Sequence, residues 1–585
     1  MDISFTIIEL GLMILLFVMA KVSYNRPSNK LRILYAAPAF VAVAMLVFVG
    51  FNKYHAGVYA AAVLILGCLF MELKKVKQKQ IIAGLLAVVI AVNLGVIVHA
   101  SGYKRMPYLK DFEEAFTVMK EHYVLTEEKG IDFDALYAKY EPLFREVDKT
   151  QDGVENYKVW QQFTGEFYDG HVGYKTKSES EMRTAFCEAY GNDYGLSLIR
   201  LSSGEFAAIN VEGYDNSYTI NSIDHDNLGL FLIKDDYKPD TAEADRLTLK
   251  NAGIKNGTII TKWNGKPIEE YFDDISYYME QYPVRENEEF FQPIYVAGMG
   301  KDMKYGEMNP DSTVDITFID ADGNEKTITA QSLGAYAPRM FDTMGKIDDG
   351  VNITNLNWQE VNEDTYMIRI SEMIYDLDTY EGTDYTEMTQ ELREKVLALK
   401  ESGVKNLIFD IRRNGGGSPY FVEGIACLFA PLGEHLTYYS AVINEETASF
   451  ERGEDGRYKM GVPSGYVGED LWHDGQIILL VNAETVSAGD DMTYMMGDFP
   501  NVTVMGFTSS NSSCQAVTGI GMEAGEINFS AVPNLLPNGE IAIDTYTDHV
   551  GRTPFDEKIP MTQDAITAIF DRGEDYVLQY AADSF

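Results

Sequence analysis

The alternation of apolar strands and helices in residues 355–585 constrains the fold most strongly. Continuous runs of mainly aliphatic and β-branched residues occupy 365–370, 406–411 and 476–481, and a long helical pattern passes through 392–399. Strands that are apolar along their whole length are covered on both faces, as in parallel sheets with helices on each side. This region is therefore predicted to be an α/β core.

Residues 1–100 differ from the rest of the chain in charge and hydropathy. They hold nine Lys/Arg and three Asp/Glu, whereas residues 101–585 hold 39 and 86. Apolar stretches close to the ~20 residues that cross a bilayer occupy 3–20, 33–51, 55–72 and 81–100. They predict an N-terminal transmembrane region of four helices, hence a multi-pass protein of the cell membrane. A cleaved signal peptide fits less well, because the N-terminus lacks basic residues.

Basic residues between the apolar stretches predict the orientation of that region. Residues 21–32 and 74–79 each contain four Lys/Arg, while the remaining link has only Lys53. Positively charged loops stay on the cytoplasmic side of a membrane. Everything after residue 100 is therefore predicted to be extracytoplasmic.

The formal net charge of −41 restricts the partners of the chain. So acidic a surface repels phosphate backbones, and no nucleic-acid partner is expected. The four cysteines fit neither a zinc-ligand spacing nor a disulfide framework.

The segment between the apolar region and the core divides into two parts. Residues 101–190 are predicted to form a helical domain, because apolar residues recur at helical spacing in 109–123 and 133–147. Short β-like runs dominate 191–345. Within them, 252–268 contains a helix end, a glycine turn, a strand and an Asn-Gly hairpin, which resembles the second half of a PDZ domain. An ordinary α+β insertion is the alternative.

The first strand end with catalytic potential is Asp410-Ile-Arg-Arg-Asn-Gly-Gly-Gly. Consecutive glycines allow unusual backbone conformations and expose N–H groups that can bind an anion or a carbonyl oxygen. A flexible turn is the alternative interpretation.

The second strand end is Thr485-Val-Ser-Ala-Gly-Asp, which leads from a strand into a helix. A helix N-terminus and the free N–H of Ala488 could stabilise an oxyanion beside Ser487. Serine is also a preferred helix cap, so capping alone would explain Ser487 equally well.

A nucleophilic serine needs a base, and His171 is the most distinctive of the eight histidines. It stands in the glycine-flanked turn Tyr168-Asp-Gly-His-Val-Gly-Tyr. A solvated turn histidine is the alternative.

These motifs, with Gly551-Arg-Thr-Pro-Phe-Asp near the end, resemble the tail-specific, or C-terminal processing, serine peptidases in their order along residues 165–560. The resemblance implies a ClpP/crotonase-like α/β peptidase core in 350–585, a helical cap in 101–190 and a PDZ-like domain in 191–345. It implies a polypeptide substrate with an unstructured tail, and no metal or organic cofactor.

Two catalytic layouts occur in that family. The Ser-Lys layout places a lysine where Asn511 stands here, and no lysine lies between Ser487 and Lys558. The chain therefore resembles the tricorn-core-like branch, which uses serine, histidine and an acid. His171 matches the histidine, and Asp548, three residues before Gly551, matches the acid.

The resemblance assigns roles to the site residues. Ser487 is the nucleophile, His171 the general base and Asp548 the residue that orients the imidazole, with Asp544 as a possible substitute for Asp548. The other residues contribute through their backbone: oxyanion-hole N–H groups from Gly416 and Ala488, and a supporting loop of Asn414, Gly415 and Gly417. A non-catalytic scaffold that binds peptides or small ligands, and an esterase with the same triad, are the alternatives.

Overall fold

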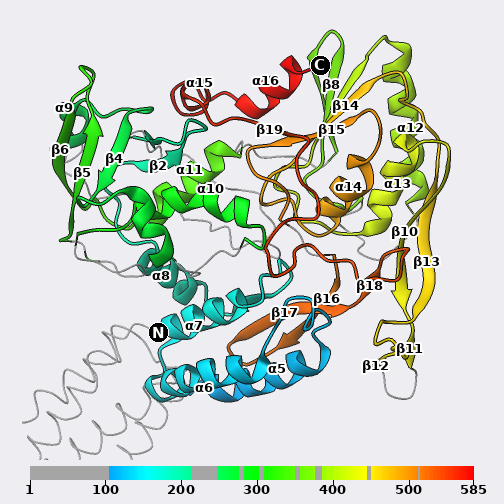
Figure 1. Cartoon of the computed structure of the whole chain (residues 1–585), viewed down its shortest axis with the longest axis horizontal. Helices are drawn as coiled ribbons and strands as arrows, with labels where there is room; N and C mark the ends of the chain where they lie inside the picture. The colour runs from blue at the N-terminus through cyan, green and yellow to red at the C-terminus, as the bar shows by residue number, and fades with distance from the viewer. Residues whose placement is uncertain are drawn as a thin grey trace, which may run out of the picture. The chain divides into compact units, whose positions relative to one another are not determined.

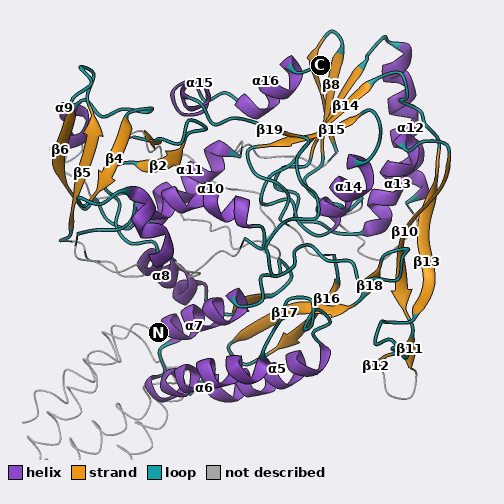
Figure 2. Cartoon of the chain, in the orientation of Figure 1, coloured by secondary structure: helices purple, strands orange, loops and turns teal. Residues whose placement is uncertain are grey.

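The computed structural model describes residues 105–211, 247–275, 282–301, 309, 311–348, 356–375, 385–444, 449–511 and 514–585. These residues form a mixed α/β structure with several separate sheets (Figure 1). Helices and strands alternate along much of the chain (Figure 2).

The predicted four-helix transmembrane region at residues 1–100 is the part of the fold class that requires correction. Within the described ranges, no helix is both long enough and apolar enough to cross a membrane. Residues 1–100 themselves lie outside those ranges. The transmembrane region is therefore unsupported, and the fold class is corrected to a mixed α/β fold.

A six-stranded sheet with the order β19-β15-β14-β9-β8-β7 forms the α/β core. β7 pairs antiparallel with β8, and every other neighbouring pair in this sheet is parallel. The strands are β7 (Asn357–Asn362), β8 (Thr365–Arg369), β9 (Asn406–Asp410), β14 (Gln476–Leu480), β15 (Val502–Gly506) and β19 (Glu557–Lys558). The three strands predicted from continuous apolar runs are confirmed as β8, β9 and β14.

Both faces of the central strands are covered. Leu407, Phe409 and Leu479 belong to one buried cluster with side chains of the neighbouring helices. Ile408 and Ile478 alternate with them, so they point to the opposite face, and they are buried as well. The helices of this region are α12 (Thr386–Glu401), α13 (Pro419–Phe429), α14 (Ala488–Gly497), α15 (Gln563–Ile566), the π-helix η3 (Thr567–Arg572) and α16 (Tyr576–Asp583).

The predicted helices at 109–123 and 133–147 are confirmed as α5 (Tyr108–His122) and α6 (Phe133–Thr150). They are followed by α7 (Gly153–Gly165) and α8 (Glu179–Ala189). Aromatic side chains fill their interior. The rings of Phe112 and Phe144 stack with centroids 4.3 Å apart.

A three-stranded sheet joins the helical part to the C-terminal half of the chain. Its order is β1-β17-β16, with β1 (Gly173–Thr176) antiparallel to β17 (Gly525–Val532) and β17 antiparallel to β16 (Ala516–Gly521). Two further small sheets are made of β10 (Gly433–Ala441), β13 (Met460–Gly468) and β18 (Asn534–Leu535), and of β11 (Ile443–Asn444) and β12 (Ser449–Phe450).

The β-rich part is a five-stranded antiparallel sheet with the strands in chain order. Its elements are β2 (Ser197–Arg200), β3 (Phe206–Ile209), α9 (Leu247–Ala252), β4 (Ile259–Trp263), the 3₁₀ helix η2 (Ile268–Asp274), α10 (Arg285–Val296), β5 (Thr313–Ile319), β6 (Glu325–Gln331) and α11 (Ala337–Ile347). The expected helix end, glycine turn and strand at 252–268 are present, with Gly253 at φ +83°. The PDZ-like assignment of this part stays a prediction.

Candidate active site

Ser487 stands where the chain passes from β14 into α14. β14 lies between β9 and β15 and is parallel to both, so the loops after these three strands leave the same edge of the sheet. In open α/β sheets this carboxyl edge is where ligands bind. The fold therefore places both predicted strand-end motifs at one edge.

The backbone of Ser487 is strained and its side chain is not used as a helix cap. Its φ is 56° and its ψ is −126°, a conformation that residues with a Cβ rarely adopt, and its side chain makes no capping hydrogen bond. Strain of this kind costs on the order of 1–3 kcal/mol and concentrates at functional sites. The capping interpretation of Ser487 is therefore wrong.

Contacts from both neighbouring loops hold the strained turn. The hydroxyl of Thr485 donates to the carbonyl of Ile411 over 2.8 Å. The N–H of Val486 donates to the carbonyl of Asn414, and the N–H of Asn511 donates to the carbonyl of Thr485. The turn is thus fixed from the β9 side and from the β15 side.

The glycine loop packs directly against the serine. A Cβ on Gly416 would lie 2.5 Å from Cβ of Ser487 and 3.1 Å from the nitrogen of Ala488. A Cβ on Gly417 would lie 2.5 Å from the carbonyl oxygen of Met373, and both glycines have positive φ. Any larger residue at Gly416 would therefore displace the candidate nucleophile, and the flexible-turn interpretation of this loop is wrong.

Asn414 organises the glycine loop. Its Nδ2 donates to the carbonyl of Ile370 over 2.8 Å, and its Oδ1 accepts the N–H of Gly416 over 2.9 Å. The N–H of Gly416 is therefore already bonded, whereas the N–H of Ala488 donates to no acceptor among the described residues. Gly415, which lies between Asn414 and Gly416 in the chain, is half-buried.

His171 is held in a tight turn that β1 ties to the C-terminal half. Oδ1 of Asp169 accepts the backbone N–H of His171 over 2.9 Å, and β1 starts two residues later on β17. The Nδ1 atom of His171 is buried and has no hydrogen-bond partner in the described part of the chain. A buried imidazole nitrogen without a partner is costly in a purely structural histidine.

The charges around His171 connect it to the helix of the nucleophile. Burial lowers the pKa of His171, while Asp169, the backbone of Gln515 and Asp491 act in the opposite direction. Asp491 belongs to α14 and lies one helical turn after Ser487. His171 is therefore within electrostatic range of α14.

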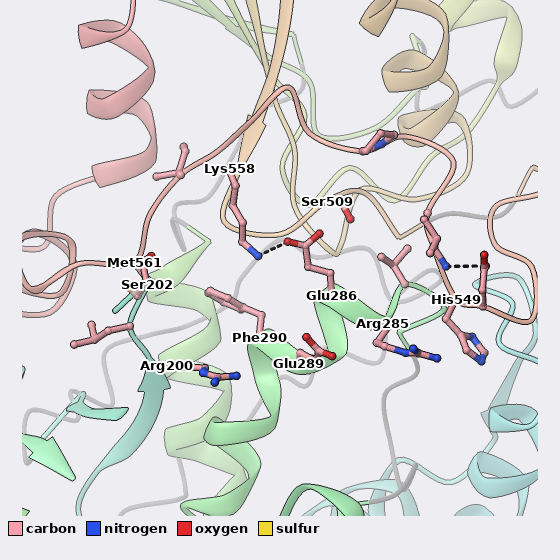
Figure 3. A pocket seen from close by; sticks show the side chains of 17 residues that line it. Arg200, Ser202, Arg285, Glu286, Glu289, Phe290, Ser509, His549, Lys558 and Met561 are labelled. Atoms are coloured by element: carbon pink, nitrogen blue, oxygen red, sulfur yellow. Dashed lines mark hydrogen bonds and ion pairs between the residues drawn. The ribbon is translucent and has the colours of Figure 1, made fainter. Parts of the chain in front are cut away.

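Asp548 does not contact His171 in this structure. It is exposed, and its Oδ1 accepts the N–H of Val550 over 3.2 Å. It lines a pocket of about 520 Å³ together with Ser509, Arg285 and His549 (Figure 3). The role of Asp548 as the acid stays a prediction.

Asp544, the possible substitute, is buried. It forms an ion pair of 2.8 Å with Lys129, and both side chains are only 2% exposed. Burial raises the pKa of Asp544 to about 6, with Lys129 opposing that rise and Asp169 adding to it. The carboxylate thus lies in the same cluster as Asp169, next to the turn of His171.

Sequence reasoning missed several charged residues of the site. Arg552 is 2.6 Å from Asp490 and 2.8 Å from Asp491, so it neutralises the two carboxylates of the first turn of α14. The motifs themselves contain these residues: Asp490 stands in the serine motif, Arg552 in the Gly551 motif and Asp169 in the histidine turn.

In the ranges that the structure describes, no group of three or more His, Cys, Asp or Glu side chains could hold a metal ion.

Two family models match the chain. Residues 364–527 match the model of peptidase family S41, and residues 107–154 match that of the tricorn protease C1 domain. The chain is therefore similar to peptidase family S41 over the central part of its C-terminal half. The predicted resemblance to this family and to its tricorn-like branch is confirmed, and the protein is a serine-type peptidase, a hydrolase.

Solved structures are similar to this chain over most of its length. Mature CPAF complexed with lactacystin is 11% identical with a TM-score of 0.45, covering 81% of this chain and 99% of that chain. The photosystem II D1 C-terminal processing protease is 15% identical with a TM-score of 0.31, covering 80% and 98%. The tricorn protease is 14% identical with a TM-score of 0.31, covering 82% and 36%. No curated protein sequence matches the chain, so the similarity to family S41 rests on the two family models.

Proposed function

We propose that this serine peptidase cleaves peptide bonds of polypeptide substrates with Ser487 as the nucleophile, through an acyl-enzyme. The observation that carries the proposal is the strained backbone of Ser487, held with its Cβ against Gly416 at the carboxyl edge of the sheet. A nucleophile on a strained strand-to-helix turn is exposed to substrate while the backbone N–H of the following residue faces the same point.

His171 is proposed as the general base. It takes the proton of the Ser487 hydroxyl as the oxygen attacks the scissile carbonyl, and it gives that proton to the leaving amine when the acyl-enzyme forms. In deacylation it takes a proton from water and returns it to Ser487. The lowered pKa of His171 supports this role, because it keeps the imidazole neutral and able to accept a proton at pH 7.

Asp548 is proposed to orient the imidazole, as the family motif implies. In this structure Asp548 is exposed and accepts the N–H of Val550, so the proposal includes a contact with His171 that forms when substrate binds. Asp544 is the alternative acid. A comparison of Asp548→Asn with Asp544→Asn at the same concentration of folded protein distinguishes the two candidate acids. Only the substitution of the acid that contacts His171 is expected to reduce kcat by roughly 10⁴-fold.

Ala488 and Gly416 are proposed as the oxyanion donors. The free N–H of Ala488 supports its assignment. Gly416 packs against Ser487, but its N–H is bonded to Oδ1 of Asn414, so it serves the oxyanion only by exchanging that acceptor. One such donor is worth about 3 kcal/mol of transition-state stabilisation in other proteases.

The substrate is proposed to be an unstructured polypeptide tail that the β-rich part, residues 191–345, presents to Ser487. Its five-stranded antiparallel sheet supports this idea, because a sheet edge can pair with an extended chain. The extracytoplasmic location of the catalytic part stays a prediction.

Turnover of denatured casein by the full-length protein tests the proposal. Cleavage is expected for the unsubstituted protein and not for Ser487→Ala, with circular dichroism confirming that the variant is folded. Faster hydrolysis of acyl esters than of casein, with both reactions lost in Ser487→Ala, would instead identify an esterase. Casein cleavage that survives Ser487→Ala would overturn the assignment of the nucleophile.

A further inference from the structure

A buried lysine outside the proposed triad joins three distant segments of the chain. Lys129 belongs to the turn that follows α5, and its side chain is only 2% exposed. Lysine is almost never buried to this extent unless its charge is paired. No motif in the sequence singles it out.

Two hydrogen bonds and one ion pair hold the ammonium group of Lys129. Nζ donates to the carbonyl of Tyr168 over 2.8 Å and to Oγ1 of Thr545 over 2.7 Å, and it lies 2.8 Å from Oδ1 of Asp544. The buried charge of Lys129 is thus paired with the carboxylate of Asp544, while two of its three N–H donors are hydrogen-bonded. The lysine therefore fixes the positions of residues 168 and 544–545 relative to each other.

The first of these segments is the turn of the candidate base. Tyr168 directly precedes Asp169, whose carboxylate accepts the N–H of His171, and Tyr168 itself has φ +46°. The hydroxyl of Tyr123, from the end of α5, donates to the same carboxylate over 3.1 Å. Lys129 thus holds Tyr168, and Tyr123 holds Asp169, the two residues that precede Gly170 in this turn.

The second segment carries both candidate acids. Residues 544–552 form a hairpin-like loop. It is closed by a bridge between Thr545 and Gly551 and by the bond from the N–H of Arg552 to the carbonyl of Asp544. Lys129 binds the start of this loop, and Asp548 stands near its tip. The ring of His549 in the same loop lies against Tyr168, with centroids 4.1 Å apart.

We propose that Lys129 is a positioning residue for catalysis, which sets the distance between the His171 turn and the 544–548 segment that supplies the acid. This inference rests on the proposed function and holds whether Asp548 or Asp544 is the acid, because Lys129 binds the segment that contains both. The group touches neither substrate nor the reacting atoms, and acts through Tyr168, Asp544 and Thr545.

The electrostatics of the cluster agree with this role. Lys129 forms its buried ion pair with Asp544, and the negative charge of Asp169 lies close enough to Asp544 to raise the pKa of Asp544. The raised pKa of Asp544 shows that Lys129 does not fully offset burial and Asp169. Removal of the cation breaks the hydrogen bond to the carbonyl of Tyr168 and the ion pair with Asp544, so we expect the two segments to move apart.

Steady-state kinetics of the full-length protein on a fluorogenic peptide test the proposal. Lys129→Met is expected to lower kcat by roughly 10–100-fold with KM changed less than about 2-fold, because a small misplacement of catalytic groups has this effect. Lys129→Arg keeps the charge and is expected to retain part of kcat. Thr545→Val removes one acceptor without burying a charge, and a smaller loss of kcat is expected.

Arg339→Met is the matched control. Arg339 forms a buried ion pair of 2.6 Å with Asp193 in the β-rich part, so its loss lowers the melting temperature without loosening the His171 turn. All assays are run well below each melting temperature and normalised to folded protein.

Unchanged kcat in Lys129→Met, or a loss of kcat equal to that in Arg339→Met, would overturn the positioning role. If Lys129→Met does not fold, Lys129→Arg and Thr545→Val decide: wild-type kcat in both contradicts the proposal. Absence of Ser487-dependent turnover in the unsubstituted protein would instead contradict the proposed function itself.

Discussion

The nucleophile turn, residues 482–488, and the histidine turn, residues 168–171, are built in different ways. The nucleophile turn is fixed by the loops of the two neighbouring parallel strands, through Ile411, Asn414 and Asn511. The histidine turn is fixed by a buried lysine and a tyrosine from the helical part and by strand pairing to β17. One half of the site thus comes from a single sheet edge, whereas the other is assembled from distant segments.

This difference indicates where the site can change shape. The serine, its glycine loop and the N–H of Ala488 are in contact within one rigid core. The positions of His171 and of the candidate acids depend on contacts between distant segments of the chain, and Asp548 is exposed. We therefore expect substitutions around Ser487 to cause large losses of kcat. Substitutions around the histidine turn should cause smaller, graded changes.

The largest effect after loss of Ser487 itself is expected from Gly416→Ala. The new methyl group would meet Cβ of Ser487 at 2.5 Å, and φ of +93° is unfavourable for alanine. We expect kcat to fall by roughly 10²–10³-fold, as when an oxyanion donor is lost. Peptide hydrolysis at saturating substrate measures the effect.

Gly253→Ala controls for the backbone conformation alone. Gly253 has a similar φ of +83°, but nothing lies within 4 Å of the position of its Cβ. This variant should be slightly less stable and fully active. If both alanine variants have the same kcat, the glycine loop is not part of the site.

The histidine half can be examined through the pH dependence of kcat/KM. Burial lowers the pKa of His171, so the acid limb of the profile should lie below the ordinary histidine value of about 6.5. Asp169→Asn removes an anion that favours the imidazolium, while the amide oxygen can still accept the N–H of His171. The limb should then move to lower pH, and a movement to higher pH would contradict the proposed role of His171.

The smallest expected effect concerns the buried acid of the second half. The folded-state pKa of Asp544 is raised to about 6 from 3.8, so the folded protein binds a proton that the unfolded chain has released between those values. Its contribution to stability is therefore present below about pH 4 and is lost as the pH rises to about 6, on the order of 2–3 kcal/mol in total. In urea unfolding, the free energy of unfolding of Asp544→Asn should fall less between pH 4 and pH 6 than that of the unsubstituted protein. An equal fall in the two proteins would exclude this contribution of Asp544.

The sequence predicted the parts of the molecule that depend on local pattern. Strands β8, β9 and β14 follow from continuous apolar runs, and α5 and α6 follow from helical spacing. The contact between Gly416 and Ser487 was predictable because parallel strands bring their carboxyl ends to one edge.

Other features could not be predicted, because they depend on long-range packing. Nothing local distinguishes Lys129 from an exposed lysine, since its burial depends on Tyr168 and Thr545, which are distant in the chain. The bond between Asn414 and Gly416 depends on a side-chain rotamer. The membrane interpretation of residues 1–100 used hydropathy alone and is not supported by any helix that the structure describes.

Active-site labelling of the full-length protein with a fluorophosphonate, followed by peptide mass mapping, tests the central claim most directly. A single adduct on Ser487 is expected, because Ser487 stands on a strained turn beside the free N–H of Ala488 and His171, whose pKa is lowered by burial, is its proposed base. Labelling should disappear in Ser487→Ala and slow greatly in His171→Ala. No adduct in the folded native protein, or an adduct that persists in Ser487→Ala, would contradict the account.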